Sequence, residues 1–154
     1  AMDWVISDVN SQYFAHVLIR LAGLSLDFRG ILSFAGILFC IWPLVLTYKI
    51  SSESPCAFPD LLHFSVLFVL LPFFINTSWP HYFICLPFVA VVAVIFDHNP
   101  DRKLLSYLAL FLQSMACFAL FGNATTYSGL GMLFWSNFLI LLHYIFLLSS
   151  KLQK

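Results

Sequence analysis

Five long apolar segments constrain what this chain can fold into. They cover residues 31–48, 61–75, 81–96, 104–121 and 130–149. A bilayer offers the backbone no water, so such segments are expected to be helices, which satisfy their own hydrogen bonds. The chain is 62% apolar and 9% charged, with a mean hydropathy of +0.95, whereas a soluble domain is about half apolar and about a quarter charged. We therefore predict an all-α, polytopic membrane helix bundle with about five transmembrane helices.

The second and third segments are joined by an uncharged polar sequence, NTSWPHY, at residues 76–82. Both segments fall short of the roughly 17 residues that a span needs, so they either recruit flanking residues or dip together around this sequence. Trp79, His81 and Tyr82 suit the boundary between water and lipid. Both interpretations of these residues, an aromatic belt and a ligand site, remain open.

Three prolines are each expected to kink a helix: Pro43, Pro72 and Pro87.

Residues 1–29 are too polar to span a membrane, but their pattern is helical. Between residues 13 and 24 apolar side chains recur at helical spacing, while Gln12, His16 and Arg20 follow one another every four residues. This pattern predicts an interfacial amphipathic helix with a polar stripe. The stripe either faces water or contributes to a ligand site.

The basic residues predict the orientation. With five spans, five of them lie in the loops and the tail on one side: Lys49, Arg102, Lys103, Lys151 and Lys154. The loops on the other side carry none, so the first side, with the C-terminus, is predicted to be cytoplasmic. A single membrane domain, 1–154, then comprises an outer interfacial segment (1–29), a transmembrane bundle (30–150) and a cytoplasmic tail (151–154).

Several classes of function find little support in the composition. The net charge is zero, with seven basic and seven acidic residues, so nucleic-acid binding is not expected. The sequence DHNPD at residues 97–101 contains metal-ligating side chains, but Asn-Pro followed by an acidic residue is typical of a turn and a helix start. No metal site is predicted. All the acidic residues lie outside the apolar segments, which leaves acid–base chemistry within the bilayer without an obvious agent.

Two histidines lie in apolar segments, His143 in the fifth and His63 near the start of the second. An imidazole in hydrocarbon needs a partner. It either forms a hydrogen bond to another helix or ligates a tetrapyrrole, haem or (bacterio)chlorophyll.

The sequence LLPFFINTSWPHYFICLP at residues 70–87 resembles a characteristic stretch of glycosyltransferase family 87, the polyprenyl-phosphate-dependent mannosyltransferase-like membrane proteins. Asn10-Ser11-Gln12 followed by Arg20 is similar to that family's Asn-Gln-Ser motif and its following Arg, with two residues exchanged. The sequence YSGL at residues 127–130, ahead of the last segment, is also similar. The resemblance covers only the C-terminal part of such an enzyme.

This resemblance implies an outward-facing cavity for a polyprenyl-phosphate sugar. Its implied lining residues are Gln12, His16, Arg20, Trp79, His81 and Tyr82. The family's catalytic acidic residue lies in a first outer loop that nothing here matches, so the chain is not expected to be catalytic on its own.

Two functions follow as hypotheses. The first is a non-catalytic multi-pass subunit that resembles the C-terminal half of a lipid-linked-sugar glycosyltransferase and works within a larger complex of the bacterial inner membrane. The alternative is an accessory structural subunit of a photosynthetic or respiratory complex that contacts pigment or lipid, with His143 or His63 as ligand. The expected partners in both cases are membrane lipids and other integral membrane subunits. A transporter is a weaker hypothesis, because the apolar segments hold no acidic residue.

Overall fold

The computed structural model describes residues 11–53, 59–75, 83–115 and 124–152, and every regular element within them is helical. This confirms the all-α prediction. The elements are α2 (Phe14–Ala22), the 3-10 helix η1 (Leu26–Phe28), α3 (Arg29–Glu53), α4 (Pro59–Phe74), α5 (Leu86–Phe96), α6 (Pro100–Ser114), α8 (Ala124–Gly129) and α9 (Met132–Leu152).

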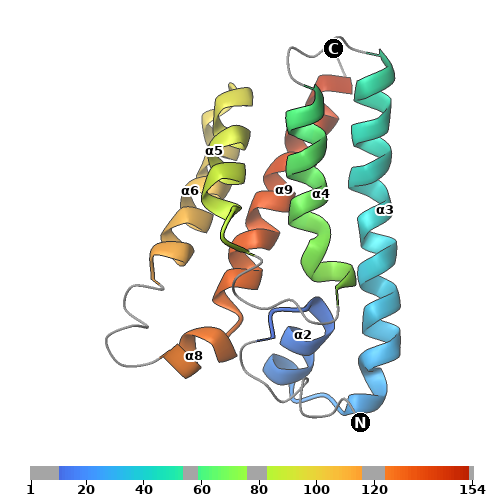
Figure 1. Cartoon of the computed structure of the whole chain (residues 1–154), viewed down its shortest axis with the longest axis vertical. Helices are drawn as coiled ribbons and strands as arrows, with labels where there is room; N and C mark the ends of the chain where they lie inside the picture. The colour runs from blue at the N-terminus through green and yellow to red at the C-terminus, as the bar shows by residue number, and fades with distance from the viewer. Residues whose placement is uncertain (1–10, 54–58, 76–82, 116–123, 153–154) are drawn as a thin grey trace.

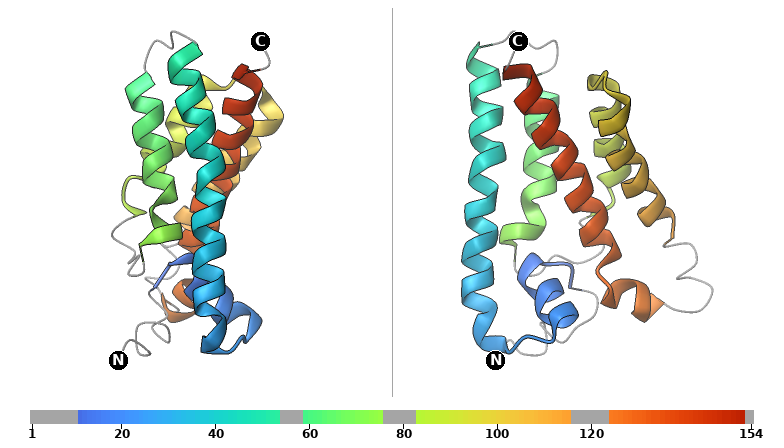
Figure 2. Two further views of the ribbon diagram at one scale, coloured as in Figure 1. Left: turned by 90° about the vertical axis from the view of Figure 1, so that its right-hand side faces the viewer. Right: turned by 180° about the vertical axis from the view of Figure 1, so that it is seen from behind.

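Helix α9 runs through the middle of the bundle. It packs against α3 and α4 on one side and against α5 and α6 on the other (Figure 1). The short helices α2 and α8 lie at one end, called here the α2 end (Figure 2). At the other end, called here the C-terminal end of the bundle, α6 begins and α9 finishes.

Among the described helices, two are long and apolar enough to cross a membrane. The first is Leu26–Ile50, which comprises η1 and most of α3 and has a mean hydropathy of 2.1. The second is α9, Met132–Leu152, with a mean hydropathy of 1.8. The helices α4, α5 and α6 have 16, 11 and 15 residues, and a span needs about 17 or more. The described residues therefore provide two helices of span length, not the predicted five.

Local sequence signals explain where two of the helices begin. Pro87 lies in the first turn of α5, where a missing N–H costs nothing, so the expected kink at this proline is wrong. Helix α5 begins at Leu86, within the predicted segment 81–96. Helix α6 begins where the sequence predicts a helix start, because Asn99 Oδ1 accepts the Asp101 N–H at 2.9 Å.

Aromatic side chains join the α2 end of the bundle to α3, α4 and α9. The ring centroid of Phe73 in α4 lies 5.5 Å from that of Phe14 in α2 and 5.7 Å from that of Phe134 in α9. Gly36 in α3 makes this approach possible, since a Cβ there would lie 2.9 Å from the Phe14 ring and 3.1 Å from the Phe73 carbonyl oxygen. The core of the bundle is therefore continuous with the packing of α2.

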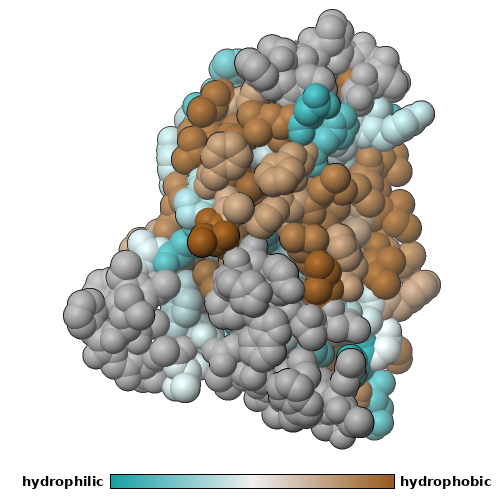
Figure 3. Space-filling view, in the orientation of Figure 1, coloured by the Kyte–Doolittle hydropathy of each residue, from teal (hydrophilic) through white to brown (hydrophobic). Residues whose placement is uncertain are grey.

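The outer surface of the bundle is apolar, whereas several polar side chains are buried inside it. On α3 many large apolar side chains between residues 31 and 48 are exposed, with exposed fractions from 36% to 75%. Figure 3 shows apolar residues over most of the described part of one face. In contrast, the following polar side chains are buried: Ser11, Gln12, His16, Thr47, Ser65, Asp97, Ser106, Ser136, Asn137 and His143.

Candidate functional site

The polar stripe of α2 turns into the bundle and not toward water. Gln12 and His16 have no exposed surface. Gln12 Nε2 donates to the Ser128 carbonyl of α8 at 3.0 Å, and Gln12 Oε1 accepts the Phe134 N–H in the first turn of α9 at 3.3 Å. That N–H is one of the four that a helix start leaves without an internal partner. Gln12 therefore caps α9 from the segment that precedes α2, and the water-facing interpretation of the stripe is wrong.

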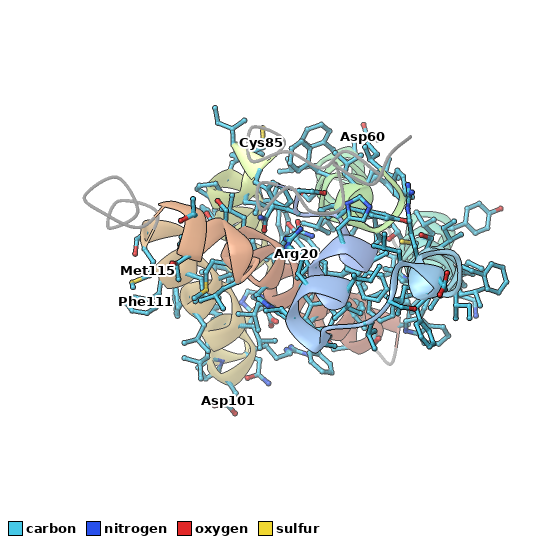
Figure 4. The ribbon with its side chains drawn as sticks, turned by 90° about the horizontal axis from the view of Figure 1, so that it is seen from below. Arg20, Asp60, Cys85, Asp101, Phe111 and Met115 are labelled. Atoms are coloured by element: carbon cyan, nitrogen blue, oxygen red, sulfur yellow. The ribbon has the colours of Figure 1, made fainter. Side chains whose placement is uncertain are left out.

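Ser11 connects the other two residues of the stripe. A hydrogen bond of 2.7 Å joins Ser11 Oγ to His16 Nδ1, and Arg20 Nη2 donates to the Ser11 carbonyl at 2.7 Å. Figure 4, viewed from the α2 end, places Arg20 near the middle of the bundle, while Asp60 and Asp101 lie at its periphery. Ser11 thus joins His16 to Arg20, whereas Gln12 binds α8 and α9.

Burial determines the electrostatics of His16. Removal from water, followed by the positive charges of Arg29 and Arg20, lowers the pKa of His16 from 6.5 to about 4. The imidazole is therefore neutral at physiological pH. Its Nε2 has no hydrogen-bond partner among the described residues. Trp79, His81 and Tyr82, the remaining residues expected here, lie outside the described part of the chain.

A second polar cluster, called here the His143 cluster, lies between the α5–α6 turn and α9. Asp97 and His143 are buried, and His143 Nε2 lies 3.0 Å from Asp97 Oδ2. A carboxylate only accepts, so Nε2 carries the proton and donates. Ser106 Oγ in α6 lies 2.7 Å from His143 Nδ1 and donates to it in the neutral imidazole. Both ring nitrogens are thus bonded within the chain.

Arg102 completes the His143 cluster. Its Nη2 donates to Asp97 Oδ1 at 2.8 Å, and its Nη1 donates to the Phe146 carbonyl of α9 at 3.2 Å. The Asn99 N–H also donates to Asp97 Oδ1, at 2.9 Å. Burial alone raises the pKa of Asp97, but the bonds from Asn99, Arg102 and His143 outweigh it and hold that pKa below its ordinary 3.8. Asp97 is therefore an ionised carboxylate.

The order Ser106, His143, Asp97 is that of a nucleophile, a base and an orienting acid. A nucleophile must reach its substrate, and Ser106 and His143 have no exposed surface. A cavity of about 110 Å³ adjoins the cluster and is lined by Asp97 and Arg102, but neither Ser106 nor His143 lines it. The arrangement therefore joins α6 and α9 to the α5–α6 turn and offers no exposed nucleophile.

From the sequence Asp97 was assigned to a turn and Ser106 was not predicted as a site residue, although a signal for their helices was present. Arg102, Ser106 and Gln113 recur along one face of α6, and α9 carries Ser136 and His143 seven residues apart. Gln113 Nε2 donates to Ser136 Oγ at 2.6 Å, about two turns along the helix from the Ser106–His143 bond. Polar residues at helical spacing in two apolar helices indicate mutually facing sides.

A polar contact also joins α4 to α9 near the proline of α4. Pro72 lies inside α4 and has no N–H. Asn137 Nδ2 in α9 donates to the Val69 carbonyl of α4 at 2.6 Å. Similarly, Thr47 Oγ1 donates to the Pro43 carbonyl within α3 at 2.6 Å. The Asn137 bond joins α9 to α4 just before Pro72, and the Thr47 bond is internal to α3.

His63, the other proposed tetrapyrrole ligand, is separate from both clusters. It lines an apolar cavity of about 150 Å³ between α3 and α4, with Thr47, Tyr48, Val66 and Leu67 among its neighbours. At His143 a tetrapyrrole would have to replace Ser106 or Asp97 as partner of a ring nitrogen. Among the described residues no group of three or more His, Cys, Asp and Glu side chains is placed to hold a metal ion.

Comparison with known proteins finds no family model, curated protein or solved structure that matches this chain.

Proposed function

We propose that this protein is a non-catalytic, multi-pass subunit of a larger membrane complex. One observation carries the proposal: apolar side chains cover the outside of the bundle, while polar side chains are buried and largely hydrogen-bonded inside. In water such a surface would associate or aggregate. In a bilayer it is the expected arrangement, because lipid solvates apolar side chains and polar ones are confined to the bundle interior.

The proposed topology follows from the distribution of charge along the bundle. Lys49, Arg102, Lys103 and Lys151 belong to helix ends at the C-terminal end of the bundle. The positive-inside rule makes this end cytoplasmic. Helices α3 and α9 then span the inner membrane of a bacterium, and the shorter α4, α5 and α6 complete the five crossings. Helix α2 lies at the outer surface.

A subunit role is supported by α3. It stands at one edge of the bundle (Figure 1), and only 28% of its most apolar 18-residue window is buried inside the chain, against 50% for α9. An unsatisfied apolar helix face of this kind fits a neighbouring transmembrane helix. The absence of an exposed nucleophile in the His143 cluster fits a non-catalytic role.

The complex itself is proposed in two forms. In the first, the chain pairs with a separate membrane chain that supplies the catalytic half of a lipid-linked-sugar glycosyltransferase. The bonds that join both His16 and Arg20 to Ser11, the residue before Gln12, support this form. In the second, the chain is an accessory subunit of a respiratory or photosynthetic complex. The cavity at His63 supports the second form.

The test uses the full chain in its native membrane. Extraction of the membranes with alkaline carbonate is expected to leave the protein in the pellet, and its release would refute the membrane location. A photo-crosslinking residue at Phe34 of α3, 63% exposed, is then compared with one at Phe111 of α6, 60% exposed. We expect a discrete protein adduct from Phe34, which mass spectrometry identifies. Lipid adducts alone at both positions would contradict the subunit role.

A further inference from the structure

The cavity beside the His143 cluster combines charge with an apolar surround. It lies at the C-terminal end of the bundle and is lined by Asp97, His98 and Arg102 from the α5–α6 turn and α6, and by Ser150 and Lys151 from α9. Its volume of about 110 Å³ is several times the roughly 30 Å³ that one water occupies in the liquid. A group of the size of phosphate therefore fits.

The charge balance of this cavity is positive. The single carboxylate, Asp97, already accepts hydrogen bonds from Asn99, Arg102 and His143, so its charge is matched within the chain. Lys151 forms no ion pair among the described residues, and its Nζ lies 6.0 Å from the centre of the Phe96 ring. The excess cation at the cavity is thus Lys151, and the His98 imidazole adds a hydrogen-bonding group.

Arg102 also retains donor capacity toward this cavity. Its Nη1 and Nη2 each make one bond within the chain, which leaves each of these nitrogens a second N–H. A guanidinium carries five N–H donors, and its planar fork suits phosphate oxygens. An arginine held in place by Asp97 and by the Phe146 carbonyl is therefore pre-positioned to contact an anion.

Two exposed apolar side chains are sequence neighbours of residues that line the cavity. Ile95 immediately precedes Phe96, and Phe146 immediately precedes Leu147, and both Phe96 and Leu147 line the cavity. Ile95 and Phe146 are themselves exposed. A ligand that places an anionic group in the cavity would thus lay an apolar tail along the neighbouring surface.

We propose that this cavity binds the phosphate group of an anionic phospholipid, with Arg102 and Lys151 as the binding cations. The inference rests on the proposed membrane location, in which this end of the bundle is cytoplasmic. Anionic lipids are enriched in that leaflet, and basic pockets between helices are where their headgroups bind. Lipid binding at this cavity does not require a catalytic role of the His143 cluster.

The test is native mass spectrometry of the full chain released from detergent with added phosphatidylglycerol or phosphatidylcholine of the same acyl chains. We expect phosphatidylglycerol to be retained preferentially. The variant Lys151→Gln should weaken that retention about five-fold, the factor for one charge near an anionic surface. The matched control, Lys103→Gln, removes the same charge from the same end of the bundle but does not alter the cavity lining.

Each other outcome overturns the inference. Equal retention of the two lipids, or equal weakening by both variants, shows that no specific site exists at Lys151. Retention of inorganic phosphate without phosphatidylglycerol shows that the source is the free ion and not a lipid. Carbonate extraction of membranes that contain the chain distinguishes a failure of the lipid site from a failure of the proposed membrane location. A protein that remains in the membrane without lipid preference refutes only the lipid site.

Discussion

Replacing His143 with leucine tests whether the His143 cluster holds α9 to the α5–α6 hairpin. Leucine fills most of the volume but removes both hydrogen bonds of the imidazole. The bond to ionised Asp97 contributes about 1.5–3 kcal/mol, and the bond to Ser106, between neutral groups within an apolar bundle, about 0.6 kcal/mol. Asp97 keeps its bonds from Asn99 and Arg102, so it is not stranded. We therefore expect His143→Leu to lower the free energy of unfolding by about 2–3.5 kcal/mol.

The assay is equilibrium unfolding of the full chain in mixed micelles with increasing dodecyl sulfate, followed by circular dichroism. The companion variant Ser106→Ala removes only the weaker bond, so its expected loss is about 0.6 kcal/mol. In the double variant the Ser106 substitution should add almost nothing, because its partner has already gone. A leucine variant as stable as the wild type, or losses that simply add, would refute the reasoning and assign the stability to apolar packing.

Three further predictions concern the α2 end and the bond between Asn137 of α9 and the Val69 carbonyl of α4. Gly131 has φ 68°, and a Cβ there would lie 2.6 Å from Val17 Cγ1, so Gly131→Ala should lose about 2–4 kcal/mol of unfolding free energy. The control Gly23→Ala, at φ 62° with nothing within 4 Å, should lose only about 1 kcal/mol, and equal losses would argue against the clash. His16 has a folded pKa of about 4 against 6.5 unfolded, so the unfolded chain binds the extra proton and stability falls by about 3 kcal/mol between pH 6.5 and pH 4. Unfolding titrations across this range should show that His16→Gln removes the fall, whereas an unchanged pH profile would contradict the burial of a neutral imidazole. Asn137→Leu withdraws the donor to the Val69 carbonyl of α4 and should lower stability by about 1 kcal/mol; amide exchange in α4 should rise, and unchanged exchange would show that this bond does not stabilise α4.

Much of the local structure could be predicted from the sequence. The amphipathic pattern between residues 13 and 24 predicts α2 (Phe14–Ala22), and Asn99-Pro100-Asp101 predicts the start of α6. These signals depend on the spacing of neighbouring residues and on the backbone preferences of Asn and Pro, which act within one or two turns. Pro87 shows the limit of such reasoning, because a proline kinks a helix or starts one depending on where the helix begins.

The candidate site depended on the tertiary structure. His143 was predicted to need a partner, but its partners lie 46 and 37 residues away in Asp97 and Ser106. The sequence predicts Asp97 as a turn residue. Asp97 is buried only because α9 packs against the α5–α6 turn. The sequence by itself determined the helical class, the apolar exterior and several helix ends, because periodicity and composition are local. Only the tertiary structure decided which polar residues meet, because that depends on which helix faces pack together, and many pairings bury similar apolar area.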